Sequence, residues 1–249
     1  MERTTVLGRL TWRVGQVVKT KAETARAKSL VLEFPDWPGH RAGQHVDIRL
    51  TAEDGYQAVR SYSIASPPDD RQVTVTIERL EYGEVSPYLV DEIQAGDPLE
   101  VRGPIGGYFV WETALGGPLF LVGGGSGIVP LMAMIQHRVA RANDARIRLL
   151  YSARSLEDVI YRTELEGLAK RSGIEVIYTY TRSQPPGWTG YQRRIDQAML
   201  GEVALAREEH PLIYICGPTP LAEGASNGLV ALGYEPARIR IERFGPSGR

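Results

Sequence analysis

Two patterns of hydrophobic and polar residues divide the chain. Up to about residue 110, short runs rich in valine, isoleucine, leucine and aromatic residues are separated by turn sequences such as Pro38-Gly39. This pattern is typical of β-strands joined by tight connections. The runs are 12–21, 24–34, 44–50, 57–64, 72–80 and 98–102. Six short strands at this spacing predict a barrel or a sandwich.

One short helix is expected to interrupt these strands at residues 86–93. Ser86 suits the N-cap of this helix, and Pro87 suits its first position. The stretch that leads into it, Gly83-Glu84-Val85-Ser86, combines a flexible glycine with a helix N-terminus, where free N–H groups attract anions. Both a pyrophosphate site and a plain helix cap are compatible with this stretch.

The hydrophobic period changes after Gly116-Gly117-Pro118. Apolar runs now alternate with stretches of helical spacing, which indicates repeated βαβ units. The apolar runs begin near 118, 147, 174, 212 and 239, and the helical stretches are 129–142, 157–170, 195–208 and 220–232. Five parallel strands with covering helices predict an open, doubly wound sheet that binds ligands at the carboxyl ends of its strands. We expect a domain boundary near 112–117 and a functional site between the two halves.

Composition narrows the function classes. The chain has 249 residues, 43% of them hydrophobic and 24% charged, which is ordinary for a globular protein of one large or two modest domains. Its net charge of −1 argues against a nucleic-acid partner. No segment approaches the roughly 20 apolar residues of a membrane span, and no signal peptide is visible, so we expect a cytoplasmic protein.

Cysteine and histidine content bears on metals. The single cysteine, Cys216, rules out a disulfide within the chain and a four-cysteine iron–sulfur cluster. The four histidines are scattered along the sequence, so we expect no metal site.

The stretch Arg60-Ser61-Tyr62-Ser63 places a cation, an aromatic ring and a hydroxyl on one predicted strand. Side chains two apart on a strand share a face, so Arg60 and Tyr62 point the same way and Ser63 lies beside them. A flat, anionic cofactor needs a ring to stack on, a positive charge for phosphate and hydrogen-bond donors. The alternative is an amphipathic strand with a tyrosine over the core and a solvated arginine.

A glycine-rich turn, Gly123-Gly124-Gly125-Ser126-Gly127-Ile128-Val129-Pro130, joins the first apolar run of the second half to a helix. Glycines here let the backbone approach a pyrophosphate at the helix N-terminus. Ile128 stands where a G-x-G-x-x-G dinucleotide fingerprint, or a nucleophile elbow around Ser126, needs glycine. The Gly-Lys-Ser/Thr of a Walker A motif is also absent. A phosphate-cradling turn of another type remains.

Four motifs in this order closely resemble the ferredoxin–NADP⁺ reductase family. They are Arg60-x-Tyr62-Ser63, Gly83-x-x-Ser86, Gly125-Ser126-Gly127-Ile128-x-Pro130 and Cys216-Gly217-Pro218. The resemblance covers roughly residues 12–244. It implies a six-stranded antiparallel FAD-binding β-barrel domain over 12–113, a five-stranded parallel α/β domain for NAD(P) over 117–249, and an N-terminal extension over 1–11.

The resemblance also implies roles for individual residues at the flavin. Arg60 would contact the flavin pyrophosphate, Tyr62 would stack on the isoalloxazine, and Ser63 would hydrogen-bond near its N5. The turn Gly83-Glu84-Val85-Ser86 would hold the pyrophosphate, which favours FAD over FMN. Near the C-terminus, Phe244 would cover the flavin face on which nicotinamide stacks, and Glu242 would lie near the site.

Further roles concern the nicotinamide nucleotide. The turn Gly125-Ser126-Gly127 would cradle its phosphates, and Cys216, followed by Gly217 and Pro218, would lie near the nicotinamide. In NADPH-selective relatives, a Ser/Thr-Arg pair and a later basic or tyrosine position hold the 2′-phosphate. Residues that match this pattern are Thr181-Arg182 and Tyr191-Gln192-Arg193-Arg194, with Arg154 as another candidate. We therefore expect NADPH to be preferred over NADH, unless these arginines are simply solvated loop charges.

The function implied is hydride transfer from NAD(P)H to FAD, with Ser63, Cys216, Glu242 and Phe244 as the residues nearest the chemistry. The single cysteine and the length lead us to expect no fused iron–sulfur or haem domain, so electrons would leave to a separate acceptor such as a ferredoxin or an oxygenase component. One alternative is a reductase of small molecules, such as free flavin, ferric chelates or quinones. Another is a nucleotide-binding electron-transfer subunit of a larger complex.

Overall fold

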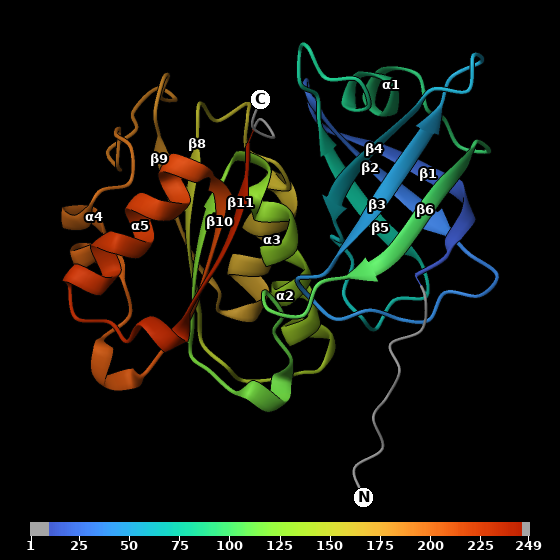
Figure 1. The fold of residues 1–249 in the computed structure, drawn as a ribbon. Helices are drawn as coiled ribbons and strands as arrows, with labels where there is room; N and C mark the ends of the chain where they lie inside the picture. The colour runs from blue at the N-terminus through green and yellow to red at the C-terminus, as the bar shows by residue number, and fades with distance from the viewer. Residues whose placement is uncertain (1–9, 246–249) are drawn as a thin grey trace, which may run out of the picture.

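The first half of the chain forms a six-stranded antiparallel sheet with the order β4-β3-β6-β1-β2-β5 (Figure 1). The computed structural model describes residues 10–245, so the expected extension over 1–11 lies outside the described residues apart from Leu10 and Thr11. The strands are β1 (Trp12–Thr24), β2 (Ala27–Glu33), β3 (His45–Thr51), β4 (Gln57–Ser63), β5 (Val73–Glu78) and β6 (Pro98–Ile105). All six expected strands are present, with ends that differ by a few residues.

The two outermost strands of this sheet meet, which closes it into a barrel. Ile64 forms a bridge with Val75, and the Ala65 N–H donates to the Thr74 carbonyl at 2.7 Å. The barrel interior is filled by apolar side chains that alternate along the strands. These include Val17, Leu30, Leu32, Val46, Ile48, Val73, Val75 and Ile77.

The short helix α1 (Ser86–Asp91) packs Leu89 into this core. The expectation that Ser86 caps α1 is wrong, because Val85 occupies the N-cap position and makes no side-chain cap. The Ser86 hydroxyl instead accepts a hydrogen bond from the Leu80 N–H at 3.0 Å. It therefore closes the loop before the helix rather than the helix itself.

The second half forms a five-stranded parallel sheet with the order β11-β10-β7-β8-β9. Its strands are β7 (Leu119–Gly124), β8 (Ile147–Ala153), β9 (Glu175–Tyr180), β10 (Leu212–Pro218) and β11 (Ile239–Phe244). The helices are α2 (Ile128–Ala140), α3 (Arg162–Ser172), α4 (Gln197–Val203) and α5 (Thr219–Ala231), with 3₁₀ turns η1 (Thr113–Leu115), η2 (Gly125–Gly127), η3 (Arg207–Glu209) and η4 (Pro236–Arg238). Because β10 lies beside β7, the strand order reverses between them, and their carboxyl ends form the usual ligand-binding position of such sheets.

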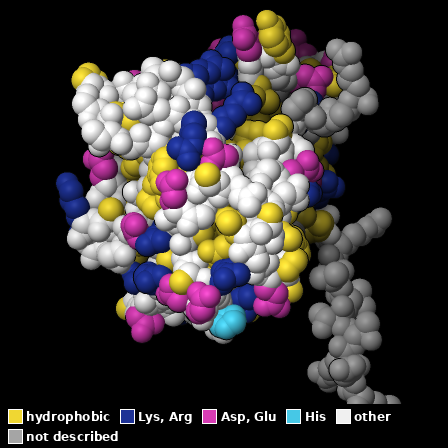
Figure 2. Space-filling view, turned by 90° about the vertical axis from the view of Figure 1, so that its left-hand side faces the viewer, with side chains coloured by type: hydrophobic (Ala, Val, Ile, Leu, Met, Phe, Trp, Pro, Cys, Tyr) yellow, Lys and Arg dark blue, Asp and Glu magenta, His cyan; other side chains and the backbone are white. Residues whose placement is uncertain are grey.

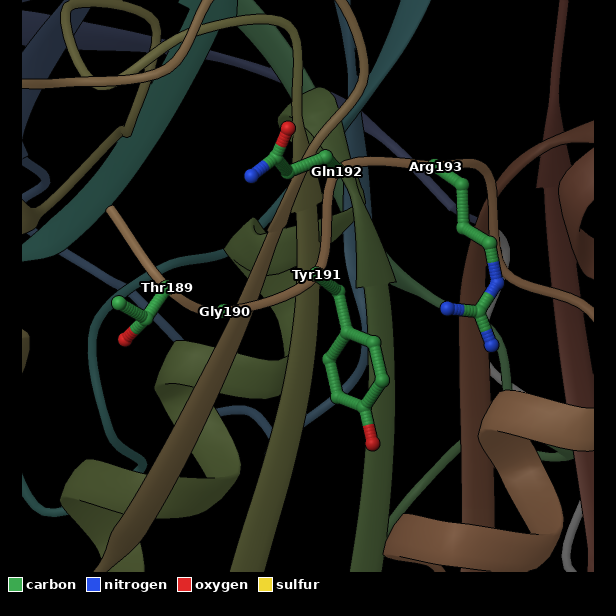
Figure 3. A pocket seen from close by; sticks show the side chains of 5 residues that line it. All are labelled: Thr189, Gly190, Tyr191, Gln192 and Arg193. Atoms are coloured by element: carbon green, nitrogen blue, oxygen red, sulfur yellow. The ribbon is translucent and has the colours of Figure 1, made fainter. Parts of the chain in front are cut away.

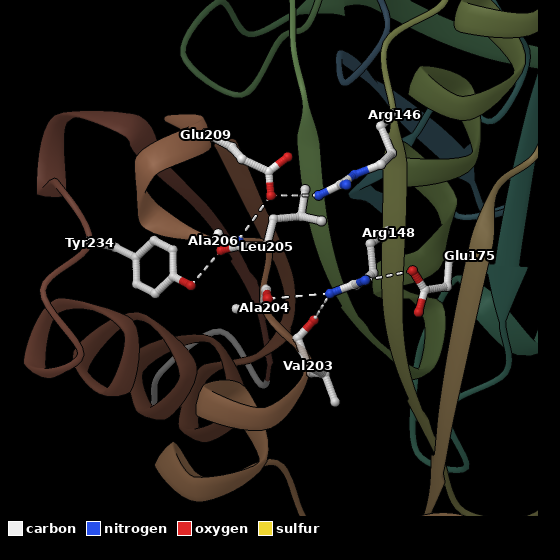
Figure 4. A network of polar contacts seen from close by, with 9 residues as sticks. All are labelled: Arg146, Arg148, Glu175, Val203, Ala204, Leu205, Ala206, Glu209 and Tyr234. Atoms are coloured by element: carbon white, nitrogen blue, oxygen red, sulfur yellow. Dashed lines mark hydrogen bonds and ion pairs between the residues drawn. The ribbon is translucent and has the colours of Figure 1, made fainter.

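Two helices end or begin differently from expectation. The helix expected over 195–208 stops at Val203, because the Arg148 guanidinium donates to the carbonyls of Val203 and Ala204 at 2.8 and 3.3 Å. The Glu209 carboxylate then accepts hydrogen bonds from the Ala206 N–H and from Arg146, the residue before β8 (Figure 4). These bonds attach the segment after α4 to the start of β8. The helix expected over 157–170 begins only at Arg162.

One apolar cluster contains residues of both halves, in addition to the separate core of the barrel and a second core in the α/β half. Helices α2 and α3 lie between the parallel sheet and the barrel (Figure 1). Their buried residues pack with Ala42, Ala65 and Trp111 from the first half of the chain. The carboxylate of Asp69 adds a hydrogen bond with His137 on α2 at 2.6 Å and an ion pair with Arg141, just after α2, at 2.5 Å.

Two further observations apply to the described residues. Within 10–245, none of the helices combines the length and apolar character needed to cross a bilayer. Over the same range, no three His, Cys, Asp or Glu side chains gather in a group that could hold a metal ion.

Candidate functional site

The first two motifs meet at one end of the barrel, although 24 residues separate them. The guanidinium of Arg60 on β4 lies 2.5 Å from the carboxylate of Glu84, which also accepts a hydrogen bond from the Tyr56 hydroxyl at 3.1 Å. Tyr62 is half-buried against the barrel core, and burial raises its pKa well above the usual range. Part of its ring stays accessible beside Arg60, as a stacking surface requires.

The turn before α1 is shaped around a glycine. A Cβ on Gly83 would lie 2.8 Å from the Ser86 hydroxyl oxygen and 3.2 Å from the Leu80 Cβ, so a side chain there would displace the loop. Val85 and Ser86 are buried beneath the turn, whereas Glu84 is exposed. The backbone of this turn therefore lies next to Arg60, as a pyrophosphate cradle needs.

The third and fourth motifs also meet. Gly125 takes a left-handed conformation with φ of +55°, which favours glycine. A Cβ on Gly127 would lie only 2.1 Å from the Cys216 carbonyl oxygen, so the turn after β7 packs directly on the end of β10. Ser126 is half-buried between them. The turn leads into the N-terminus of α2, a helix of 13 residues, whose N–H groups and dipole favour phosphate.

The end of β11 adds an acid and an aromatic ring. Glu242 pairs in register with Cys216, and Phe244 pairs with Pro218. Burial raises the pKa of Glu242 to about 7, and its Oε2 has no hydrogen-bond partner among residues 10–245. Burial first, and Glu242 second, raise the pKa of the Cys216 thiol, which is thus neutral and not a nucleophilic thiolate. Phe244 is 37% exposed.

The candidate 2′-phosphate ligands fall into two groups. The Arg154 carbonyl accepts N–H bonds from Arg182 at 2.9 Å and Ser183 at 3.1 Å, so the loops that carry Arg154 and Arg182 are adjacent. Arg193 is instead engaged by Asp196 at 2.7 Å and lies 4.0 Å from Glu202.

A hollow of about 340 Å³ lies at Arg193 and the residues that precede it (Figure 3). Its lining residues are Thr189, Gly190, Tyr191, Gln192 and Arg193. The Tyr191 hydroxyl donates to Glu202 at 2.6 Å, and Arg194 is exposed. In Figure 2, Lys and Arg side chains lie at the upper edge of the face, where Figure 1 places the carboxyl ends of the parallel strands, and others lie near the lower edge among acidic side chains.

Three residues near the glycine turn carry no recognisable sequence signal. The carboxylate of Glu78, at the end of β5, lies 3.5 Å from the position of a Cβ on Gly125. The hydroxyl of Tyr151 donates to the Gly125 carbonyl at 3.0 Å, and the hydroxyl of Tyr161 reaches Thr76 on β5. The barrel therefore contacts the glycine turn directly.

The residues present fit a flavin nucleotide together with a pyridine nucleotide. The barrel carries one glycine turn and a partly exposed ring beside a cation, and the doubly wound sheet carries a second glycine turn and, within residues 10–245, a buried carboxyl oxygen without a hydrogen-bond partner. This combination defines a two-domain flavoprotein reductase.

Comparison with known proteins supports that class. Residues 16–110 match the oxidoreductase FAD-binding domain family, and residues 121–227 match the oxidoreductase NAD-binding domain family. The chain belongs to the ferredoxin–NADP⁺ reductase superfamily of FAD-containing, NAD(P)H-dependent reductases. Its fold has the barrel and the parallel sheet that the sequence predicts.

Three similar proteins illustrate the range of relatives. The glycine betaine monooxygenase reductase subunit of Pseudomonas aeruginosa is 34% identical over 213 residues, 83% of this chain and 57% of that protein. The flavohemoprotein of Bordetella pertussis is 30% identical over 95% of this chain and 61% of its own length. The FAD/NAD-binding domain of nitric oxide dioxygenase from Vibrio cholerae has a TM-score of 0.84 at 26% identity, covering 94% of this chain and 99% of that one. The chain thus spans about three fifths of the two curated relatives.

Proposed function

We propose that this chain takes a hydride from NADPH onto bound FAD and passes the electrons to a separate redox protein. The observation that supports this most is the meeting of the glycine turn, the Cys216 end of β10 and barrel strand β5 at one place. Such a junction lets two flat cofactors approach each other while their phosphates are held on opposite domains. Hydride transfer needs close alignment, so the protein contributes mainly positioning and electrostatics.

Each residue of the site has a role in this proposal. Arg60 and the turn at Gly83 bind the FAD pyrophosphate, the Tyr62 ring stacks on the isoalloxazine, and Ser63 donates a hydrogen bond near N5. FAD supplies a ring system that accepts two electrons as a hydride and releases them singly.

On the nucleotide side, Gly125 to Gly127 hold phosphate and Phe244 covers the flavin face until nicotinamide arrives. Cys216 keeps its proton and forms the floor of the nicotinamide site. Glu242 holds a proton at a carboxyl oxygen near neutral pH. We assign the 2′-phosphate of NADPH to Arg182 and Arg154.

The partner in this proposal is an oxygenase or ferredoxin-type protein. The similar Pseudomonas aeruginosa protein is named as the reductase subunit of a monooxygenase, which supports an acceptor of this kind. Because this chain spans only part of that relative, the acceptor is proposed from the shared FAD- and NAD-binding domains alone.

The test combines cofactor analysis with rapid kinetics. The purified protein should release FAD on heating, and NADPH should bleach its visible flavin absorption faster than NADH does in anaerobic stopped flow. Purified ferredoxins should then reoxidise the flavin faster than ferric chelates or quinones do. Release of FMN alone would reverse the cofactor assignment, and a preference for chelates or free flavin would favour a small-molecule reductase. Tyr62→Ala should weaken FAD binding by about 1–3 kcal/mol, as base stacking on aromatic rings implies.

A further inference from the structure

Two buried tyrosine hydroxyls connect the phosphate turn of the nucleotide domain to the flavin barrel. The Tyr151 hydroxyl, on β8, donates to the Gly125 carbonyl at 3.0 Å and accepts from the Ile160 N–H at 3.3 Å. Tyr161, which follows Ile160 in the chain, donates from its hydroxyl to the Thr76 hydroxyl on β5 at 2.5 Å. Both tyrosines are almost fully buried.

The barrel end of this connection is itself anchored. The Ser29 hydroxyl on β2 donates its hydrogen to Glu23 at 2.8 Å, so the Thr76 hydroxyl is the donor in its hydrogen bond to Ser29 at 2.7 Å. Residues two apart on a strand share a face, so Thr76 and Glu78 both point toward the nucleotide domain. The Glu78 carboxylate reaches the Gly125 turn, 3.5 Å from the position of a Cβ there. The same face of β5 thus contacts both parts of the connection.

The backbone at the junction is unusual. Tyr161 has φ of +61°, a left-handed conformation that bulky residues rarely adopt. Residues in such conformations persist when the surrounding contacts hold them, and they gather at functional sites. Here the buried ring and the hydroxyl bond to Thr76 hold Tyr161, and the turn places the Ile160 N–H against Tyr151.

We propose that Tyr151 and Tyr161 are positioning residues: Tyr151 sets the shape of the phosphate turn, and Tyr161 sets the location of that turn relative to the flavin barrel. This inference rests on the proposed function, since it assigns the turn to nucleotide phosphates. The two tyrosines would thus control two different properties of the nucleotide site. The shape of the turn controls how tightly the nucleotide binds, and its location controls how well the nicotinamide is aligned for hydride transfer.

The experiment compares three FAD-loaded variants, Tyr151→Phe, Tyr161→Phe and the matched control Tyr214→Phe. Tyr214 is a buried tyrosine of the same sheet whose hydroxyl also bonds to the first half of the chain, at the Val110 carbonyl 2.8 Å away, and not to the turn. NADP⁺ affinity is measured by calorimetry, and the limiting rate of flavin reduction by NADPH is measured in anaerobic stopped flow. Melting temperature is recorded for all three, because loss of a buried hydrogen bond lowers stability in each.

We expect Tyr151→Phe to raise the NADP⁺ dissociation constant roughly tenfold with little change in the limiting rate. Tyr161→Phe should lower the limiting rate roughly tenfold with little change in that constant. Tyr214→Phe should change neither. If Tyr151→Phe and Tyr161→Phe both match the control, or if both change the same quantity, the inference is wrong.

The proposed function fails separately from this inference. A wild-type protein that binds NADP⁺ but is not reduced by NADPH or NADH would overturn the proposed function, while the affinity comparison would still decide the role of Tyr151. A wild-type protein that binds neither NADP⁺ nor NAD⁺ would overturn both.

Discussion

The ion pair between Arg60 and Glu84 occupies the place where the flavin pyrophosphate is expected. Both side chains are about half exposed, at 46% and 50%, so their attraction is screened by solvent and contributes little to stability. In the proposed site, Glu84 would compete with phosphate for the same guanidinium. We therefore expect the negative charge of Glu84 to oppose FAD binding.

We predict that Glu84→Gln tightens FAD binding by about twofold to fivefold, the range expected for release of an exposed ion pair. Fluorescence titration of the apoprotein with FAD measures this change, and raising the ionic strength should reduce it. Glu81→Gln, an exposed glutamate of the same loop, is the control and should leave the affinity unchanged. Weaker FAD binding in Glu84→Gln would instead mean that Glu84 orients Arg60 for the cofactor.

Glu242 makes stability depend on pH. Burial raises its pKa from 4.5 to about 7, so the native state holds this proton more tightly than the unfolded chain does. The resulting stabilisation is complete below about pH 4.5 and is lost as the pH rises through about 7, where the carboxylate must ionise in a buried place. A shift of this size corresponds to about 3 kcal/mol.

We therefore predict that Glu242→Gln has a higher free energy of unfolding than the parent at pH 8, by up to about 3 kcal/mol. The advantage should shrink toward pH 5. Urea unfolding of the apoprotein at pH 5, 6.5 and 8 measures it, with Glu223→Gln, an exposed partner of Arg243, as the control. A difference that does not vary with pH would show that Glu242 is already ionised in the folded state.

At the scale of elements, the candidate arginines differ in whether a carboxylate binds them. Arg154 and Arg182 lie on the loops after β8 and β9, and Arg193 lies in the segment before α4. Arg182 lies on a loop that hydrogen-bonds to the backbone at Arg154, and no carboxylate within residues 10–245 forms an ion pair with either side chain. Arg193 is bound by Asp196, which also caps α4 by accepting the Met199 N–H at 2.8 Å. Arg193 thus serves the start of α4 more than an incoming phosphate.

We predict that Arg182→Ala lowers the ratio of kcat/KM for NADPH to that for NADH by roughly tenfold or more, because a charge-assisted pair contributes about 1.5–3 kcal/mol. Arg193→Ala should change the ratio much less and should instead lower the melting temperature. Steady-state kinetics with both nucleotides measure this. Equal kcat/KM values in the parent protein, or a larger effect in Arg193→Ala, would contradict the assignment.

At the scale of the whole molecule, the site depends on how two separately built halves pack together. The apolar cluster around Trp111 and α2, with the contacts of Asp69 to His137 and Arg141, joins the barrel to the parallel sheet. Phe244 ends β11 at the carboxyl edge of the parallel sheet, in register with Pro218 of β10, and is only partly covered. Residues 246–249 lie outside the described residues.

We predict that Phe244→Ser retains FAD, binds NADP⁺ more tightly and has a lower kcat, because nicotinamide no longer competes with the ring and product leaves slowly. A new long-wavelength charge-transfer band on addition of NADP⁺ is the spectroscopic check. Leu115→Ser, at another partly exposed apolar residue, is the control and should change none of these. If Phe244→Ser loses the flavin or melts at a markedly lower temperature, Phe244 is a packing residue.

The sequence by itself determined the two architectures and the four motifs. The period of apolar residues reports which face of a local element is buried, so the strands of both sheets and the helices α2 and α5 were predictable. Gly83 and Gly125 meet requirements of the local backbone, which a sequence pattern can indicate, whereas Gly127 is required by the close approach of the Cys216 carbonyl. The exact domain limits at 113 and 117 stay a prediction.

Only the tertiary structure decided which charges and hydroxyls meet. Glu84 reaches Arg60 across 24 residues, and Arg148 ends α4 from another strand, neither of which leaves a local pattern. A tyrosine in an apolar strand, such as Tyr151, looks the same whether or not its hydroxyl finds a partner. Such contacts depend on the closure of the barrel and the packing of two domains, which bring distant residues within hydrogen-bond distance.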